Sequence, residues 1–225
     1  MPRMNHTLRA LAWLLRYPDA ALREHLVALR DALHVERALT FGRLAEIDTL
    51  IDHLQALPPL AAEADYVELF DRGRRTSLHL FEHVHGDSRE RGPAMVDLTR
   101  TYEAAGLVPR PDELPDFLPV VLEFASTQPP EAAREFLREF AHIVRAVFSA
   151  LAERRSLYAV LPAALLDLAG ERAERVTLPD EPAVDDSWAE PEAFAGCSTQ
   201  GQQAPVQPIQ IHRPGRAPRG RGAAA

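Results

Sequence analysis

The chain has 225 residues, of which 46% are hydrophobic and 26% are charged, a balance typical of a globular protein with a substantial core. Its formal net charge is −8, and all 25 basic residues are arginine. The lack of lysine excludes a P-loop lysine and a Schiff-base lysine, and the acidic balance disfavours a nucleic-acid-binding surface, which needs a positive footprint. The same acidity suits a partner that carries positive charge.

Apolar residues recur at steps of three and four over the first 178 residues, a spacing that predicts one amphipathic helix after another. Asp19 and Thr40 stand where a side chain can cap the next helix, and Gly86 is expected to end the histidine-rich one. The expected helices cover, in chain order, about 8–15, 20–33, 40–57, 60–70, a histidine-rich segment up to 86, 93–105, 112–126, 133–151 as the longest, and 157–168.

Strict alternation of apolar and polar residues is missing, so no sheet is predicted. After about Leu178 the composition shifts to Pro, Gly, Gln and Ala without apolar periodicity. We therefore predict an all-α, single-domain helical bundle over residues 1–178 and a largely disordered C-terminal tail over 179–225. The arginine-rich end of the tail, "HRPGRAPRGRG", offers a weak contact for nucleic acid, but a solvated terminus is the favoured interpretation.

The cellular compartment is suggested by three features. The single cysteine, Cys197, rules out an intramolecular disulfide, which favours a reducing compartment. The apolar run near the N-terminus is interrupted by Arg9 and has no A-x-A cleavage site, so no signal peptide is expected. No stretch approaches the about 18 uncharged apolar residues of a membrane span. Together they predict a cytoplasmic protein.

The first candidate site is "SLHLFEHVHGD", which contains the pattern H-x-x-E-H at His79, Glu82 and His83. On a helix this spacing can present two imidazoles to zinc with the glutamate as base, as in a zinc-dependent hydrolase. However, the arginines of "DRGRR" lie just upstream, and nothing marks a third ligand. A solvated polar helix face is the favoured alternative, so we expect no catalytic residue, no bound metal and no cofactor.

The second candidate site is "DELPDFLPVVLEFAS", where carboxylates flank an apolar core. Pro115 is expected in the first turn of a helix. Three interpretations are open: a capped core helix, paired carboxylates for acid–base chemistry without a companion nucleophile, or an acidic rim beside an apolar groove that seats a basic amphipathic helix. The third uses both the charges and the hydrophobic residues. The carboxylates are Asp112, Glu113, Asp116 and Glu123.

Three stretches occur in order: "DYVELFDRGRRTSLHLFEHVHGDSRERGPAMVDLTRTYEAAG", "DELPDFLPVVLEFA" and "WAEPEAF". They combine Y-V-E-x-F-D, R-R-x-S-L, G-D-x-R-x-R-G and L-P-D-x-L-P-x-V-L-E-F. Together they resemble the NarJ-type chaperones for respiratory nitrate reductase, within the wider group of molybdoenzyme maturation chaperones that includes the TorD and DmsD proteins. The resemblance runs from about Leu8 to Phe194. One departure is Phe117, where members commonly carry histidine, so any peptide or nucleotide contact of that histidine is missing here.

The resemblance implies an all-helical, non-catalytic cytoplasmic protein. We further expect a monomer or weak dimer that, from its acidic charge and the lack of a long apolar stretch, neither binds nucleic acid nor inserts into a membrane. Such a chaperone binds the N-terminal segment of the nitrate reductase catalytic (alpha) subunit, assists insertion of the molybdenum cofactor and prevents early docking on the membrane subunit. The implied partner segment is a short amphipathic helix with basic residues. The candidate peptide-binding residues are Tyr66, Phe70, Arg74, Arg75, Asp112, Glu113, Leu114, Asp116, Phe117 and Glu123, with Tyr66, Phe70, Leu114 and Phe117 forming the groove and the carboxylates its rim.

Overall fold

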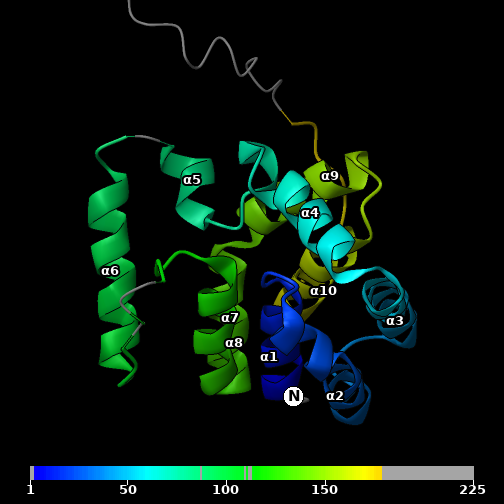
Figure 1. Ribbon diagram of the computed structural model, residues 1–225. Helices are drawn as coiled ribbons and strands as arrows, with labels where there is room; N and C mark the ends of the chain where they lie inside the picture. Colours follow the sequence, from blue (N-terminus) through cyan, green and yellow to red (C-terminus); the bar gives the residue numbers. More distant parts are fainter. Residues whose placement is uncertain (1–2, 87, 109, 111–112, 179–225) are drawn as a thin grey trace, which may run out of the picture. The chain divides into compact units, whose positions relative to one another are not determined.

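The computed structural model describes residues 3–86, 88–108, 110 and 113–178. Within them the chain forms ten α-helices and two 3-10 helices, and the only strand-like pairing there is an isolated bridge between His79 and Phe117 (Figure 1). The predicted all-α fold is confirmed. The elements are α1 (Asn5–Leu14), α2 (Ala20–Glu36), α3 (Phe41–Ala56), α4 (Pro59–Phe70), η1 (Arg74–Thr76), α5 (Leu80–His85), α6 (Arg91–Ala104), α7 (Leu118–Thr127), α8 (Pro130–Glu139), α9 (Ala141–Glu153), η2 (Leu157–Ala159) and α10 (Val160–Ala169).

Three helix ends follow directly from local sequence chemistry. The Asp19 carboxylate accepts a hydrogen bond from the backbone N–H of Leu22 at 2.8 Å, and the Thr40 hydroxyl accepts one from Arg43 at 3.2 Å. Both satisfy N–H groups that a helix leaves without an internal partner. Gly170 ends α10 with a φ of +80°, a conformation that glycine adopts without strain. The two predicted N-caps are therefore confirmed.

The core is built around α1 and α10. The helix α1 packs most extensively against α7 and α2, and its residues Leu8, Leu11 and Leu14 are completely buried. In α10 every residue except Asp167 is buried, because the helix lies against α9, α8 and α3. Helices that are apolar all round belong in the interior. No helix in the described part of the chain is long and apolar enough to cross a bilayer.

The expected long helix over 133–151 is wrong, because the structure divides it into α8 and α9. The break falls at Phe140, whose φ of −94° and ψ of 0° lie outside regular helix geometry. Both helices pack on α10, so both keep apolar residues at steps of three and four on the side that faces it. The spacing of apolar residues therefore continues across Phe140, and the sequence pattern alone does not indicate the break. Tertiary packing, and not a proline or glycine, decides the division.

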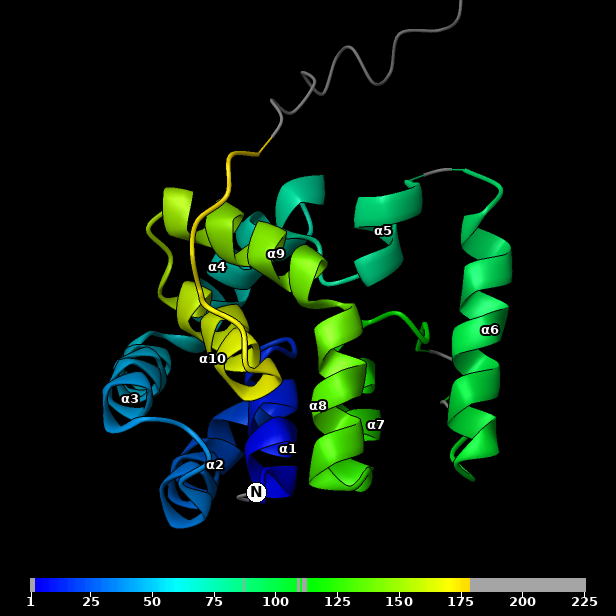
Figure 2. The same cartoon turned by 180° about the vertical axis from the view of Figure 1, so that it is seen from behind.

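Helix α6 stands apart from α7, α8, α9 and α10 in both views (Figures 1 and 2). It packs mainly on the short helix α5, and Leu98 and Tyr102 are its buried residues. The hydroxyl of Tyr102 donates a hydrogen bond to the carbonyl of Pro115 at 2.8 Å, and its ring centroid lies 4.7 Å from that of Phe124 in α7. Tyr102 is therefore a main connection between α6 and the helices around α1.

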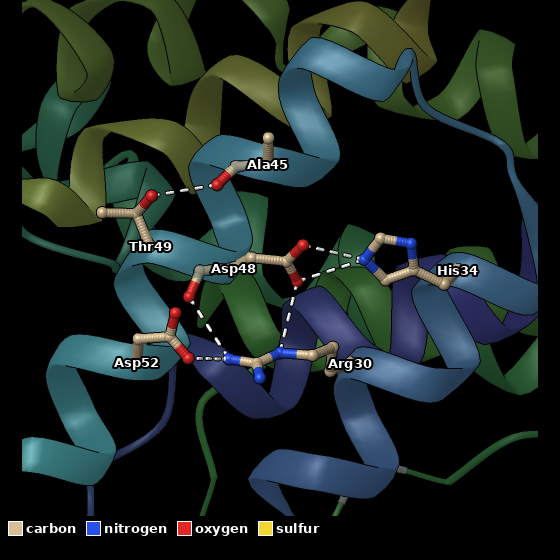
Figure 3. A network of polar contacts seen from close by, with 6 residues as sticks. All are labelled: Arg30, His34, Ala45, Asp48, Thr49 and Asp52. Carbon is tan, nitrogen blue, oxygen red and sulfur yellow. Dashed lines mark hydrogen bonds and ion pairs between the residues drawn. The ribbon is translucent and has the colours of Figure 1, made fainter.

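A polar network joins α2 to α3 (Figure 3). Asp48 lies 3.3 Å from the Nε of Arg30 and 2.9 Å from the Nε2 of His34, and Arg30 also pairs with Asp52. These side chains are partly exposed, so each pair contributes little to stability. The network links two helices, and none of its residues lines the pocket described below.

The predicted tail, including Cys197, lies outside the described residues. We expect a chain that ends at Leu178 to unfold at the same temperature as the full chain, because the helices up to α10 bury their apolar faces against one another. Thermal melts of both chains, followed by circular dichroism, check this. A markedly lower melting temperature of the shortened chain would show that part of 179–225 stabilises the helices.

Candidate functional site

A pocket of about 440 Å³ opens between α1, the C-terminal part of α6 with the residues after it, and α7. Its volume falls in the range of ordinary ligand pockets. Most of the lining is apolar or aromatic, and charged side chains stand among it. The lining residues are Arg9, Trp13, Tyr102, Leu107, Val108, Arg110, Glu113, Val120, Glu123, Phe124 and Thr127.

The aromatic wall of the pocket continues into the core. The ring of Phe124 lies 4.7 Å from Tyr102 and 4.8 Å from Phe136, which in turn lies 5.3 Å from Phe140. Trp13 on the opposite side stacks on His25 at 5.1 Å. Because these rings hold one another in place, the pocket presents a preformed apolar surface.

Arg16 connects the two sides of the pocket at its edge. Its Nη2 atom lies 3.0 Å from a carboxylate oxygen of Glu113 and 3.1 Å from one of Glu123. Its guanidinium carbon is 5.9 Å from the centre of the Trp13 ring, within the range of a cation–π contact. Two expected rim carboxylates, Glu113 and Glu123, thus lie together at the pocket.

Asp116 does not belong to the rim, and its expected position there is wrong. Its side chain is 0% exposed and accepts a hydrogen bond from the N–H of Phe81 at 3.0 Å, in the first turn of α5. His79 Nδ1 lies 3.4 Å and Arg91 Nη2 3.7 Å from the same carboxylate. The backbone carbonyl of Asp116 accepts from Leu80 at 3.0 Å. Asp116 therefore caps α5 from a distant segment.

This pairing also explains where α7 begins. The N–H of Leu118 donates to the carbonyl of Leu78 at 2.8 Å, so the chain is extended before the helix starts. The helix α7 begins at Leu118 with Pro119 in its first turn, and the expectation that Pro115 occupies a first turn is wrong. Phe117, half-buried, stacks on the His79 ring at 5.2 Å.

Tyr66 and Phe70, which were expected in a surface groove, are buried instead. Their rings lie 4.7 Å apart, and Tyr158 packs against Phe70 at 5.2 Å. The Tyr66 hydroxyl donates to the carbonyl of Leu15 at 2.7 Å, and burial raises its pKa above the usual value. These aromatic residues join α4, α1 and η2 within the core.

The other candidates are more scattered. Leu114 is half-exposed beside Glu113 in sequence, whereas Arg75 on η1 pairs with Glu153 of α9 at 2.8 Å. Arg74 is on the same 3-10 helix, and Asp112 lies outside the described residues.

The sequence did not indicate two residues of the pocket, Trp13 and Tyr102. An aromatic residue in an apolar stripe has the same sequence pattern whether it faces the core or a pocket.

The histidine pattern does not form the arrangement that a zinc site requires. The helix α5 begins at Leu80, so His79 lies outside it and cannot share a helix face with His83. The Nε2 of His83 is 2.8 Å from the carbonyl of Ser77, and Glu82 accepts from the Ser77 hydroxyl at 2.5 Å. The described residues contain no group of three or more His, Cys, Asp or Glu side chains able to hold a metal ion.

A family model described as "Nitrate reductase delta subunit" matches residues 17–160, which include the α6 and α7 sides of the pocket. The "Nitrate reductase molybdenum cofactor assembly chaperone NarJ" of Escherichia coli K12 is 46% identical over 156 residues, 69% of this chain and 66% of that protein. The "Probable nitrate reductase molybdenum cofactor assembly chaperone NarW" of the same strain is 43% identical over 164 residues, 72% of this chain and 68% of its own length. A "Probable nitrate reductase molybdenum cofactor assembly chaperone NarJ" of Bacillus subtilis 168 is 34% identical over 163 residues, 71% of this chain and 86% of the relative.

Proposed function

Because the chain belongs to the nitrate reductase delta subunit family, we propose that it is a non-catalytic assembly chaperone for nitrate reductase. In this role it binds the N-terminal segment of the apo catalytic subunit in the cytoplasm, assists insertion of the molybdenum cofactor, and delays docking on the membrane subunit. The observation that carries the proposal is the family match over residues 17–160, together with relatives whose names describe molybdenum cofactor assembly chaperones.

The pocket between α1, α6 and α7 is the site that we propose for the partner segment. An amphipathic helix binds by laying its apolar side chains into a groove of this kind. Trp13, Tyr102 and Phe124 offer aromatic surface to such side chains, and burial of one aliphatic side chain contributes about 1.5–3 kcal/mol. Glu113 and Glu123 stand beside this surface as partners for basic residues of the helix, and Arg9 and Arg110, which line the same pocket, are partners for acidic ones. The half-exposed Leu114 extends the apolar area.

The site is tested by titration calorimetry with a synthetic peptide of the N-terminal segment of the catalytic subunit. We expect Trp13→Ala to weaken binding at least tenfold, because central aromatic residues dominate the affinity of such interfaces. Phe41→Ala is the matched control, since Phe41 is 84% exposed at the start of α3, away from the pocket. Equal affinity of both variants would place the peptide elsewhere on the protein.

The cellular role needs a separate experiment. The chain should co-purify with the apo catalytic subunit from cells that express the reductase genes, and reductase from cells that lack the chain should contain much less molybdenum. Elemental analysis of the purified reductase measures this. A reductase with full molybdenum content in the absence of the chain would refute the proposed function.

A further inference from the structure

The wall that α7 contributes to the pocket is largely covered in this structure. Phe124 and Val120, which form this wall, are only 7% and 8% exposed. The ring of Tyr102, on α6, lies over Phe124 with a distance of 4.7 Å between the ring centroids. A partner gains affinity chiefly from apolar surface that its binding removes from water. The α7 wall therefore contributes little to binding while α6 stays in this position.

Helix α6 is weakly attached to the helices around it. Two of its 14 residues are buried, Leu98 and Tyr102, whereas eight of the ten residues of α7 are buried. Gly106, just beyond the C-terminal cap of α6, has a φ of +80°. Because glycine adopts positive and negative φ with similar ease, the chain can turn at this residue. Few buried apolar contacts are typical of an element that opens without global unfolding.

A hydrogen bond of Tyr102 holds the end of α6 that lies at the pocket. The hydroxyl of Tyr102 donates to the carbonyl of Pro115 at 2.8 Å, in the segment that leads into α7. Burial raises the pKa of Tyr102 above its usual value, so the hydroxyl keeps its proton and remains a donor. At the other end of α6, Arg91 lies 3.7 Å from Asp116, a longer contact. Tyr102 therefore both covers Phe124 and fixes α6 above it.

The α7 wall does not depend on α6 for its shape. Phe136 supports the ring of Phe124 at 4.8 Å, and Phe140 supports Phe136 at 5.3 Å. Both supporting rings belong to α8 and its end, which pack on α10 and α7. A movement of α6 would thus uncover an apolar surface that is already in place.

We propose that α6 is a movable cover of the site and that the hydroxyl of Tyr102 holds it closed. The partner segment binds when α6 has moved away, and one of its apolar side chains replaces the Tyr102 ring on Phe124. Without a partner, α6 keeps this apolar surface from water and so limits self-association. This inference rests on the proposed function, and it adds how access to the site is controlled. The measured affinity is then the intrinsic affinity reduced by the fraction of molecules in which α6 is open.

Hydrogen exchange of the protein without partner tests the movement of α6. We expect the amides of α6 to exchange at least tenfold faster than those of α7, because α6 opens alone. Tyr102→Phe removes the hydrogen bond and keeps the ring, so it should speed exchange in α6 about fivefold and leave α7 unchanged. Tyr66→Phe is the matched control, because the Tyr66 hydroxyl also donates to a backbone carbonyl, that of Leu15 at 2.7 Å, but between α4 and α1. It should not speed exchange in α6.

Titration calorimetry of the same variants, with the synthetic peptide of the N-terminal segment of the catalytic subunit, tests the link to binding. We expect Tyr102→Phe to bind the peptide about fivefold more tightly than the unaltered protein, because the closed form loses a hydrogen bond and the open fraction rises. Tyr66→Phe should bind with unchanged affinity. A Tyr102 side chain that served only as a fixed wall of the pocket would give unchanged or weaker binding in Tyr102→Phe.

A second variant reaches α6 without touching the pocket. Leu98 is buried and is not among the residues that line the pocket, so its replacement affects the peptide only through the attachment of α6. We expect Leu98→Ala to bind the peptide at least fivefold more tightly and to exchange the amides of α6 faster than the unaltered protein. Thermal melts establish that the other helices of each variant remain folded.

The outcomes separate the two proposals. If α6 exchanges as slowly as α7, or if Tyr102→Phe and Leu98→Ala do not tighten binding, the movable cover is wrong and the proposed function stands. If the peptide and the intact apo catalytic subunit fail to bind the unaltered protein and both variants, the proposed function is wrong and this inference falls with it.

Discussion

Replacing Asp116 with alanine should lower the free energy of unfolding by about 3 kcal/mol. The carboxylate is completely buried and accepts the N–H of Phe81 at 3.0 Å, with His79 and Arg91 beside it. Its removal leaves a buried backbone donor without a partner and separates α5 from the segment that leads into α7. Urea denaturation followed by circular dichroism measures the change.

The control for this prediction is another aspartate paired with an arginine. Asp97 lies 3.3 Å from Arg100 on the surface of α6 and its side chain is 75% exposed, so Asp97→Ala should change the free energy of unfolding by less than about 0.5 kcal/mol. Asp116→Asn retains an acceptor for the Phe81 N–H and should fall between the two. If Asp116→Ala were as stable as Asp97→Ala, the buried carboxylate would have no role in holding α5.

The second large effect is expected from Phe70→Ala, which should lower the free energy of unfolding by about 3–4 kcal/mol. Phe70 is buried against Tyr66 and Tyr158, with ring centroids 4.7 and 5.2 Å away, and its deletion leaves a cavity in this aromatic cluster. The fraction of protein that remains folded should still bind the partner peptide, because Phe70 does not line the pocket between α1, α6 and α7.

The measurement combines urea denaturation with calorimetry on the same preparation. Phe41→Ala serves as the control again, since the same deletion at an exposed position should leave the stability unchanged within about 0.5 kcal/mol. A fully stable Phe70→Ala protein that has lost peptide affinity would restore Phe70 to the binding surface and contradict its assignment to the core.

The helices could be predicted because the residues that begin and end each helix lie next to it in the sequence. Asp19 and Thr40 cap helices as their chemistry suggests, and glycine ends α10. The break at Phe140 was not predictable, because the apolar period serves two helices that pack on the same neighbour. Periodicity reports which residues are buried, and it does not report the direction of the helix axis.

The candidate site was predictable only in part. Glu113 and Glu123 do lie together at a pocket, but Asp116, in the same stretch of sequence, is turned inward by a partner more than thirty residues away, Phe81. A carboxylate that caps a distant helix and one that meets solvent have the same local sequence signal. Tyr66 was misplaced for a similar reason, since its partner is a carbonyl of Leu15, 51 positions away.

The packing of α1 on α7 has a consequence for synthesis of the chain. The Nε of Arg9 donates to the hydroxyl of Ser126 at 3.2 Å across 117 positions of sequence, and the leucines of α1 are buried largely by these distant residues. As the chain leaves the ribosome, α1 can meet α2 early, but its remaining apolar face stays uncovered until α7 has emerged. A protein of this fold therefore exposes the apolar face of α1 for much of its translation, and that face should be covered late, once residues 118–127 have left the exit tunnel.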